Sequence, residues 1–339
     1  MSRLYRGLSR AVLVLAPLVS SCSSPYSTFR PGGGDAQMLY TLGMWLCGIA
    51  LLITLAMTLL VVWGALRRRG SLDEHLPVGV DGGKRWILIG GLAIPGVALT
   101  ALFVVTLLAL EPFSGDTDEA DLELEVIAHR WWWEVNYVTA EVPAEHFVTA
   151  NEIHIPVGRR VGITLRSADV IHSFWVPRLH GKLDAIPGIE NRLVLQADEP
   201  GTYHGQCAEY CGGQHAFMHF LIVAQEEEEY EIWAARQRQP ATPPEDPKLA
   251  RGLAAFEQHS CGLCHRVRGT EARGTNGPDL THFGSRMTIG AGIMPNNRPR
   301  LQAWIVDAQA IKPGINMPTL TEFDGPTIDA LASYLESLQ

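Results

Sequence analysis

Two long segments without a charged residue constrain this chain more than any other feature of its sequence. They cover residues 36–66 and 86–110, and each exceeds the roughly 20 apolar residues that cross about 30 Å of hydrocarbon. The stretch between them is rich in Arg and Lys, which places it in the cytoplasm. We therefore predict a two-helix transmembrane hairpin over residues 36–110, kinked at Pro95 in its second helix, with everything after it exported.

The first residues have the pattern of an export signal. Arg3, Arg6 and Arg10 precede a short apolar run that ends in Val-Ser-Ser, and Cys22 follows directly. This resembles a bacterial lipobox, so we expect residues 1–21 to be a lipoprotein-type signal peptide and Cys22 to carry the lipid. A plain signal peptide with an incidental cysteine is the alternative. Together with the two apolar spans, either reading leads us to expect the chain in the bacterial plasma (inner) membrane, with its exported part on the outer, periplasmic side.

Composition excludes several classes of protein. Hydrophobic residues make up 47% of the 339 residues and charged residues 19%, which argues against a disordered chain and an ordinary cytosolic enzyme. The formal net charge of -9 makes a nucleic acid an unlikely partner, because polyanion binding depends on basic surface. We expect a multidomain membrane protein.

An all-β domain is predicted to follow the hairpin. Apolar residues alternate with polar ones in several short segments between residues 122 and 223, separated by Gly and Pro. That pattern is typical of a small antiparallel sandwich or barrel. A charged helix over residues 226–238 closes this domain, which we place at residues 111–238, and residues 239–247 form a Pro-rich linker.

A group of soft metal ligands lies near the end of the β domain. Two thiols, one imidazole and one thioether fall within twelve residues, and a second imidazole lies upstream. These residues are His172, Cys207, Cys211, His215 and Met218. Without Cys207 the set is that of a mononuclear blue-copper site, and a second thiolate allows two copper ions to be bridged. A disulfide between the two cysteines is one alternative, but it does not explain the nearby imidazole and thioether. Structural zinc is another, but zinc sites are built from Cys, His and carboxylate ligands and not from thioethers.

These residues resemble the binuclear copper A motif of cytochrome c oxidase subunit II, a family with a two-helix anchor and a cupredoxin-like sandwich. The resemblance implies that both cysteines bridge the coppers, that each histidine binds one copper, and that Met218 is a weak ligand. It also implies that the Glu209 carbonyl binds copper and that its carboxylate reaches a magnesium ion shared with subunit I. Trp131, in a His-Arg-Trp-Trp-Trp stretch, matches the residue where electrons arrive from cytochrome c. Core packing is the alternative for these tryptophans, and we prefer it for Trp132 and Trp133.

The C-terminal part carries a haem c attachment signature, Cys261-Gly-Leu-Cys264-His265. Its thiols form thioethers with the haem and His265 becomes an axial ligand. Amphipathic helices are predicted on both sides of the signature, the first containing Gly252 for close helix contact and the last capped by Asp324.

Residues 248–339 resemble an all-α class I cytochrome c domain. The resemblance implies that the Pro278 carbonyl orients His265 and that Met317 is the sixth haem ligand. Met294, Met287 and His282 are the other candidates for that position.

Together these features predict the electron-accepting subunit of a terminal respiratory oxidase. Electrons pass from an external cytochrome c or other donor through one covalent haem c and binuclear copper A to haem in subunit I, where oxygen is reduced to water. Subunit I and subunit III are the expected partners. The alternatives are a copper A subunit of a nitric oxide reductase-type complex and a stand-alone membrane-anchored carrier cytochrome.

Overall fold

The computed structural model describes residues 24–67, 82–114, 120–138 and 146–339. The chain divides into two compact units, residues 41–118 and the remainder. The expected signal peptide and the lipidated Cys22 lie outside the described residues.

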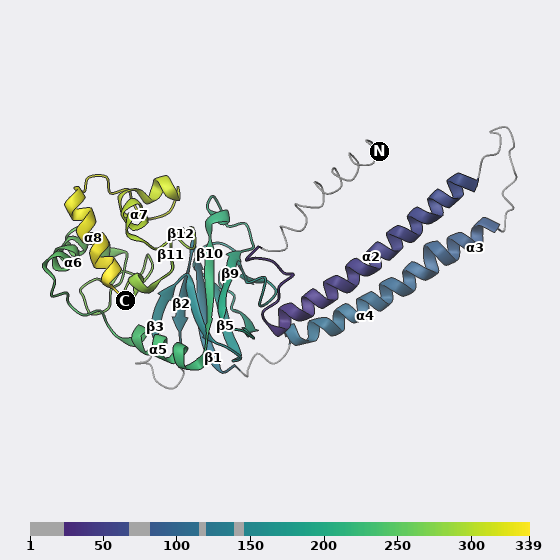
Figure 1. Ribbon diagram of the computed structural model, residues 1–339, viewed down its shortest axis with the longest axis horizontal. Helices are drawn as coiled ribbons and strands as arrows, with labels where there is room; N and C mark the ends of the chain where they lie inside the picture. Colours follow the sequence, from purple (N-terminus) through teal and green to yellow (C-terminus); the bar gives the residue numbers. More distant parts are fainter. Residues whose placement is uncertain (1–23, 68–81, 115–119, 139–145) are drawn as a thin grey trace, which may run out of the picture. The chain divides into compact units, whose positions relative to one another are not determined.

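The smaller unit consists of long apolar helices (Figure 1). They are α2 (Gly34–Arg67), α3 (Gly82–Leu88), the π-helical turn η2 (Ile89–Ala93) and α4 (Ile94–Ser114). Two stretches, Gly34–Arg67 and Gly83–Leu108, are apolar enough and long enough to cross a membrane. Many of their large apolar side chains are exposed, as expected of helices that face lipid.

A π-turn interrupts the second apolar helix directly before Pro95. The backbone N–H of Ile94 bonds to the Ile89 carbonyl, five residues back, instead of four. Proline supplies no N–H, and its ring collides with the carbonyl of the residue four positions earlier, so the preceding turn widens. The irregularity predicted at Pro95 therefore takes the form of a π-turn.

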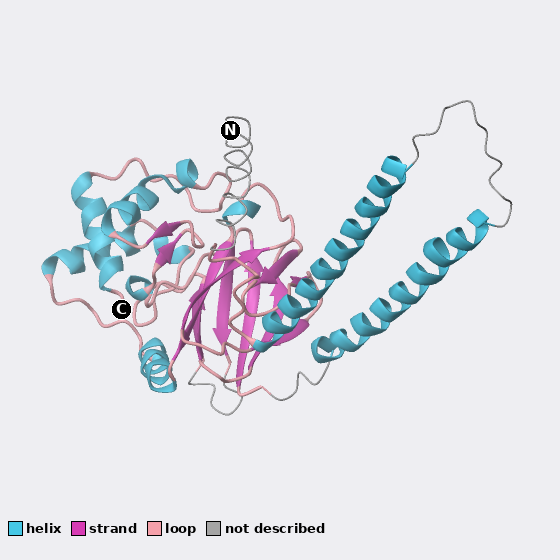
Figure 2. Ribbon diagram, turned by 45° about the vertical axis from the view of Figure 1, so that its right-hand side comes forward, coloured by secondary structure: helices cyan, strands magenta, loops and turns pink. Residues whose placement is uncertain are grey.

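The β domain is a sandwich of two five-stranded sheets (Figure 2). The first sheet has the order β3 (Phe147–Ala150), β2 (Trp132–Tyr137), β1 (Leu122–His129), β5 (Val161–Ser167) and β8 (Asn191–Leu195). The second has the order β4 (Glu152–Pro156), β10 (His219–Gln225), β9 (Gly201–Cys207), β6 (His172–Trp175) and β7 (Leu183–Ala185). Period-two alternation gives these strands their buried faces. In β1, for example, Leu124, Val126 and Ala128 are buried and the residues between them are only partly buried.

The prediction of a purely antiparallel domain is wrong for two strand pairs. β1 pairs with β5 in parallel, with Leu124 opposite Ile163, and β10 pairs with β4 in parallel. Between β1 and β5 the chain passes through β4 of the other sheet, and that crossover sets the strand direction. Alternation in sequence reports which face of a strand is buried and carries no information on its direction.

Aromatic rings fill the centre of the sandwich. Trp133 is completely buried and meets Phe174 and Phe220 edge-on, with ring centroids 5.7 and 5.3 Å apart. This confirms core packing for Trp133. Helix α5 (Glu227–Arg238) then covers one end of the domain through Trp233, which stacks on His154.

The haem-attachment signature lies in a small helical domain. Its elements are α6 (Pro247–Gln258), η5 (Cys261–Leu263), η6 (Phe283–Ser285), β11 (Thr288–Ile289), β12 (Met294–Pro295), α7 (Arg298–Ile311) and α8 (Gly325–Ser337). Asp246 caps α6 and Asp324 caps α8, each by accepting hydrogen bonds from backbone N–H groups of the first turn. The helix cap predicted at Asp324 is confirmed.

The linker between the two domains is packed and does not hang free. Ala241 donates a backbone hydrogen bond to the Arg268 carbonyl, at 2.8 Å. The Arg268 guanidinium in turn donates to the carbonyls of Gln237 and Arg238 at the end of α5. These contacts join the β domain and the helical domain at the linker.

Helices α6 and α8 meet at Gly252. A Cβ atom at this position would lie 2.2 Å from the Ala330 carbonyl oxygen and 2.6 Å from Tyr334 Cβ. Only glycine permits this approach, which confirms the close helix contact predicted there.

Gly252→Val is expected to destabilise the helical domain by about 1–3 kcal/mol, because overpacking forces the two helices apart. Thermal unfolding followed by haem absorbance measures the change. Arg251→Val places the same side chain on the exposed side of α6 and serves as the control. Equal stability of the two variants would contradict the role assigned to Gly252.

Candidate metal centre and haem site

The metal-ligand candidates converge on one segment, residues 207–218, which we call the metal loop. It connects β9 to β10, and its ends are joined by a backbone hydrogen bond from Cys207 to the Met218 carbonyl, at 2.9 Å. Gly212 takes a positive φ of 113°, which favours glycine in the turn. His172 reaches the loop from β6, which runs beside β9 in the same sheet.

The loop brings all the predicted donor atoms together. Cys207 Sγ lies 3.7 Å from Cys211 Sγ and 3.9 Å from His172 Nδ1. Cys211 Sγ lies 3.7 Å from His215 Nδ1 and 3.9 Å from Met218 Sδ. The Glu209 carbonyl oxygen is 3.2 Å from Cys207 Sγ. The two thiols stand between the two imidazoles, with the thioether and carbonyl at the margins.

The thiol pair favours one negative charge before any metal binds. The contact with Cys211 lowers the pKa of Cys207 to about 3, with a further contribution from His172. The same contact, together with burial, raises the pKa of Cys211. All five described cysteines are free thiols, so this pair is unlinked and open to a metal. Two buried thiols, two imidazoles and a thioether are soft donors, and they fit copper.

Asp169 orients His172 and was not identified from the sequence. Its Oδ1 lies 2.8 Å from His172 Nε2, and it also accepts backbone N–H groups of Arg130 and Val170. Burial raises the pKa of Asp169, but these hydrogen bonds outweigh it and lower the pKa overall. A carboxylate on Nε2 fixes the ring so that Nδ1 faces the thiols. The only sequence signal is an Asp three residues before the His.

Trp131 lies against the metal loop. Its indole Nε1 donates to the Cys211 carbonyl at 3.0 Å. A Cβ atom on Gly212 would come within 3.0 Å of Trp131 Cζ2, so the ring covers this glycine closely. The ring is partly buried, in contrast to fully buried Trp133.

The haem-attachment signature is arranged for covalent and axial ligation. Cys261 and Cys264 lie at the turn η5, and His265 Nδ1 is 2.8 Å from the Pro278 carbonyl. Since a carbonyl only accepts, Nδ1 carries the proton and Nε2 keeps its lone pair for a metal. Burial lowers the pKa of His265, which favours the neutral ring. Gly277 lies directly against this ring, where a Cβ would be 2.7 Å from Cε1. The residues present therefore fit haem c.

The four candidates for the sixth haem ligand lie in different surroundings. Met317 follows α7 in a loop whose carbonyls at Ile315 and Met317 accept from Gln309 Nε2. Met294 is in β12 and Met287 is exposed. His282 Nε2 lies 3.0 Å from the Gln239 carbonyl of the linker, so this ring is engaged there.

Contacts between the two domains were also not identified from the sequence. Thr288 donates to buried Glu152 on β4, at 2.9 Å, and His219 donates to the Ala291 carbonyl, at 3.0 Å. Lys312 and Gln214 make further contacts close to Trp131. No local motif marks these residues, because their partners are distant in sequence.

Comparison with known proteins assigns each of the two domains to a family. Residues 122–225 match the family described as cytochrome C oxidase subunit II, periplasmic domain, and residues 249–339 match the cytochrome c family.

Curated relatives extend the similarity over the whole chain. Cytochrome c oxidase subunit 2 of Alkalihalophilus pseudofirmus is 35% identical, over 91% of this chain and 90% of that protein. Its counterpart in Bacillus subtilis is 31% identical, over 97% and 96% of the two chains.

The crystal structure of the periplasmic domain of cytochrome oxidase subunit II from Bradyrhizobium japonicum covers 36% of this chain and 97% of that one. It is 30% identical, with a TM-score of 0.34.

The chain belongs to the cytochrome c oxidase subunit II family, in the form that carries a C-terminal cytochrome c domain. It is a membrane-anchored subunit of a haem-copper terminal oxidase, and it is where electrons enter that oxidase. The match favours this reading over a nitric oxide reductase subunit and a stand-alone carrier. The family implies copper A in the β domain and haem c in the helical domain.

Asp169→Asn is expected to weaken copper binding about 10- to 100-fold, because the amide holds His172 less firmly than the carboxylate does. Competition with a chelator measures the affinity. Asp198→Asn changes an exposed carboxylate of the same domain and is the control. Unchanged affinity in the Asp169 variant would show that His172 needs no carboxylate to bind metal.

Proposed function

We propose that electrons from an external donor enter this chain at haem c, pass to binuclear copper A and leave for haem in subunit I, where oxygen is reduced to water. The observation that carries the proposal is the convergence of both thiols, both imidazoles, the thioether and the Glu209 carbonyl on one loop. When bound, copper A and haem c each supply a one-electron carrier.

The residues of the chain hold these carriers, and none of them forms or breaks a covalent bond during electron transfer. Cys207, Cys211, His172 and His215 would hold the two coppers, with both thiolates shared between the metals. Met218 and the Glu209 carbonyl are weak ligands. Buried thiolates exclude water from the centre and hold its geometry fixed, so little reorganisation accompanies a change of charge. This ligand set supports one electron shared over two metals.

In the helical domain, Cys261 and Cys264 would attach the haem, and His265 and Met317 would bind its iron. The hydrogen bond from His265 Nδ1 to the Pro278 carbonyl fixes the ring and makes Nε2 more basic. A methionine opposite the histidine favours a higher reduction potential than two histidines would. Trp131 is the aromatic side chain through which copper receives electrons.

Several further features belong to the proposal. The Glu209 carboxylate binds magnesium at the boundary with subunit I, and subunit III completes the complex. Both redox domains lie on the outer side of the bacterial plasma membrane, and Cys22 adds a lipid anchor to the two helices. The external donor is cytochrome c or a protein of similar potential.

The fragment 111–238 loaded with copper is expected to give a multiline paramagnetic spectrum, because one unpaired electron is shared over two copper nuclei.

Cys211→Ser removes one bridge, so electron transfer from copper to the haem of subunit I in the assembled oxidase is expected to stop while haem c absorbance stays intact. A four-line mononuclear spectrum from the unmodified fragment, or unchanged turnover of the variant, would contradict the bridging assignment.

Met317→His is expected to lower the reduction potential of haem c markedly, because a second imidazole replaces the thioether. A redox titration followed by haem absorbance measures the shift. Met287→His alters an exposed methionine in the same domain and is expected to leave the potential unchanged. If Met294→His lowers the potential and Met317→His does not, the sixth ligand is Met294.

A further inference from the structure

Lys312 is a buried hydrogen-bond donor between the two redox domains. Its side chain is 2% exposed, and its Nζ donates to the Trp131 carbonyl and to the Gly290 carbonyl, both at 2.8 Å. Trp131 belongs to the β domain and Gly290 to the helical domain, so one ammonium joins both. Burial lowers the pKa of Lys312 to about 7. A desolvated ammonium is costly, and its hydrogen bonds to two carbonyls offset that cost.

The loop that begins at Lys312 lies on the metal loop. Gln214, which precedes the copper ligand His215, donates from Nε2 to the Pro313 carbonyl at 2.8 Å. A Cβ atom on the next residue, Gly314, would lie 3.8 Å from Trp131 Cη2, an ordinary van der Waals distance. The same loop leads to Met317, the proposed haem ligand.

Trp131 therefore contacts both metal-bearing loops. On one side its indole N–H bonds to the Cys211 carbonyl, and its ring covers Gly212. On the other side the ring faces Gly314, and the backbone carbonyl of Trp131 accepts a hydrogen bond from Lys312. A series of contacts thus runs from Gly314, three residues before Met317, through Trp131 to the carbonyl of Cys211.

We propose that Lys312 is a positioning residue for electron transfer between the two centres: it holds the loop 312–317 against Trp131, so that electrons cross from haem to copper at this contact. The inference rests on the proposed function, since it concerns the step between the two proposed cofactors. Contacts between domains of one chain resemble transient protein interfaces, so a single buried bond has a large effect on the docked population. The docked helical domain also covers Trp131, so a separate cytochrome delivers its electron to haem c.

The lysine suits this position because it is long and carries several donors. Its ammonium reaches across the domain boundary and serves two carbonyls at once. Methionine keeps the length of the side chain and its apolar stem but donates no hydrogen bond. Glutamine keeps a donor on a shorter side chain. These two substitutions therefore separate loss of the bond from loss of packing.

The test measures the rate of haem c oxidation by copper A in the assembled oxidase, after a light flash excites an added photochemical electron donor that reduces haem c. Lys312→Met is expected to slow this step about tenfold, and Lys312→Gln to slow it less. A tenfold change corresponds to about 1.4 kcal/mol, which is comparable to the net contribution of one hydrogen bond. The haem potential and the copper spectrum are expected to stay as in the unmodified oxidase, which a general disruption of either domain would not allow.

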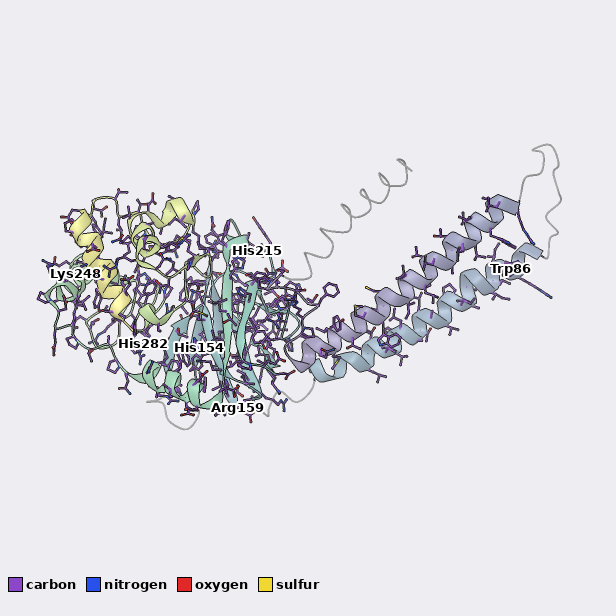
Figure 3. All side chains as sticks on the ribbon, viewed as in Figure 1. Trp86, His154, Arg159, His215, Lys248 and His282 are labelled. Carbon is purple, nitrogen blue, oxygen red and sulfur yellow. The ribbon has the colours of Figure 1, made fainter. Side chains whose placement is uncertain are left out.

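Lys248→Met is the matched control. Lys248 lies on α6 in the same domain, in an ion pair with Asp329, and in Figure 3 it is far from His215 of the metal loop. Its rate is expected to equal that of the unmodified oxidase. A rate unchanged in Lys312→Met overturns the proposal, and if that variant fails to bind haem, an unchanged rate in Lys312→Gln overturns it. If the unmodified oxidase passes no electron from haem c to copper, the proposed function itself fails.

Discussion

Two thiols held 3.7 Å apart between two imidazoles are the constraint on which the rest of this structure depends. Such a group of donors is stable without metal only where the backbone fixes it. The metal loop is tied at its base by the Cys207–Met218 backbone bond, and β6 beside β9 supplies His172. The aromatic core of Trp133, Phe174 and Phe220 supports those strands. The sandwich thus serves as a rigid frame for ligands that one short loop mostly provides.

In the helical domain, too, backbone contacts hold the candidate ligands of a cofactor, the proposed haem c. His265, the proposed haem ligand, is oriented by the Pro278 carbonyl, and helices α6 and α8 pack closely at Gly252. Its contacts with the β domain gather around Trp131, where Lys312 and Gln214 fix the loop that leads to Met317. The linker, bound to Arg268, keeps the domains together, while the side chains near Trp131 determine how they meet.

The sequence alone predicts what is local. The spacing of residues 207–218 and the Cys-Gly-Leu-Cys-His signature predict both candidate sites, because side chains close in sequence are brought together by a single turn. The apolar spans and the Asp324 cap of the last helix are equally local. Strand direction in the β1–β5 pair was missed, because alternation is the same for both directions. Asp169 and Lys312 were missed because each acts on a partner brought near only by the fold.

The central claim is that one chain carries two docked redox centres and passes electrons between them internally. The most direct measurement reduces haem c selectively and follows copper reduction over a wide range of oxidase concentrations. A first-order rate that does not change with concentration is the predicted result, because the two domains are already in contact. A rate that rises in proportion to concentration would contradict the account, since electrons would then pass between separate molecules.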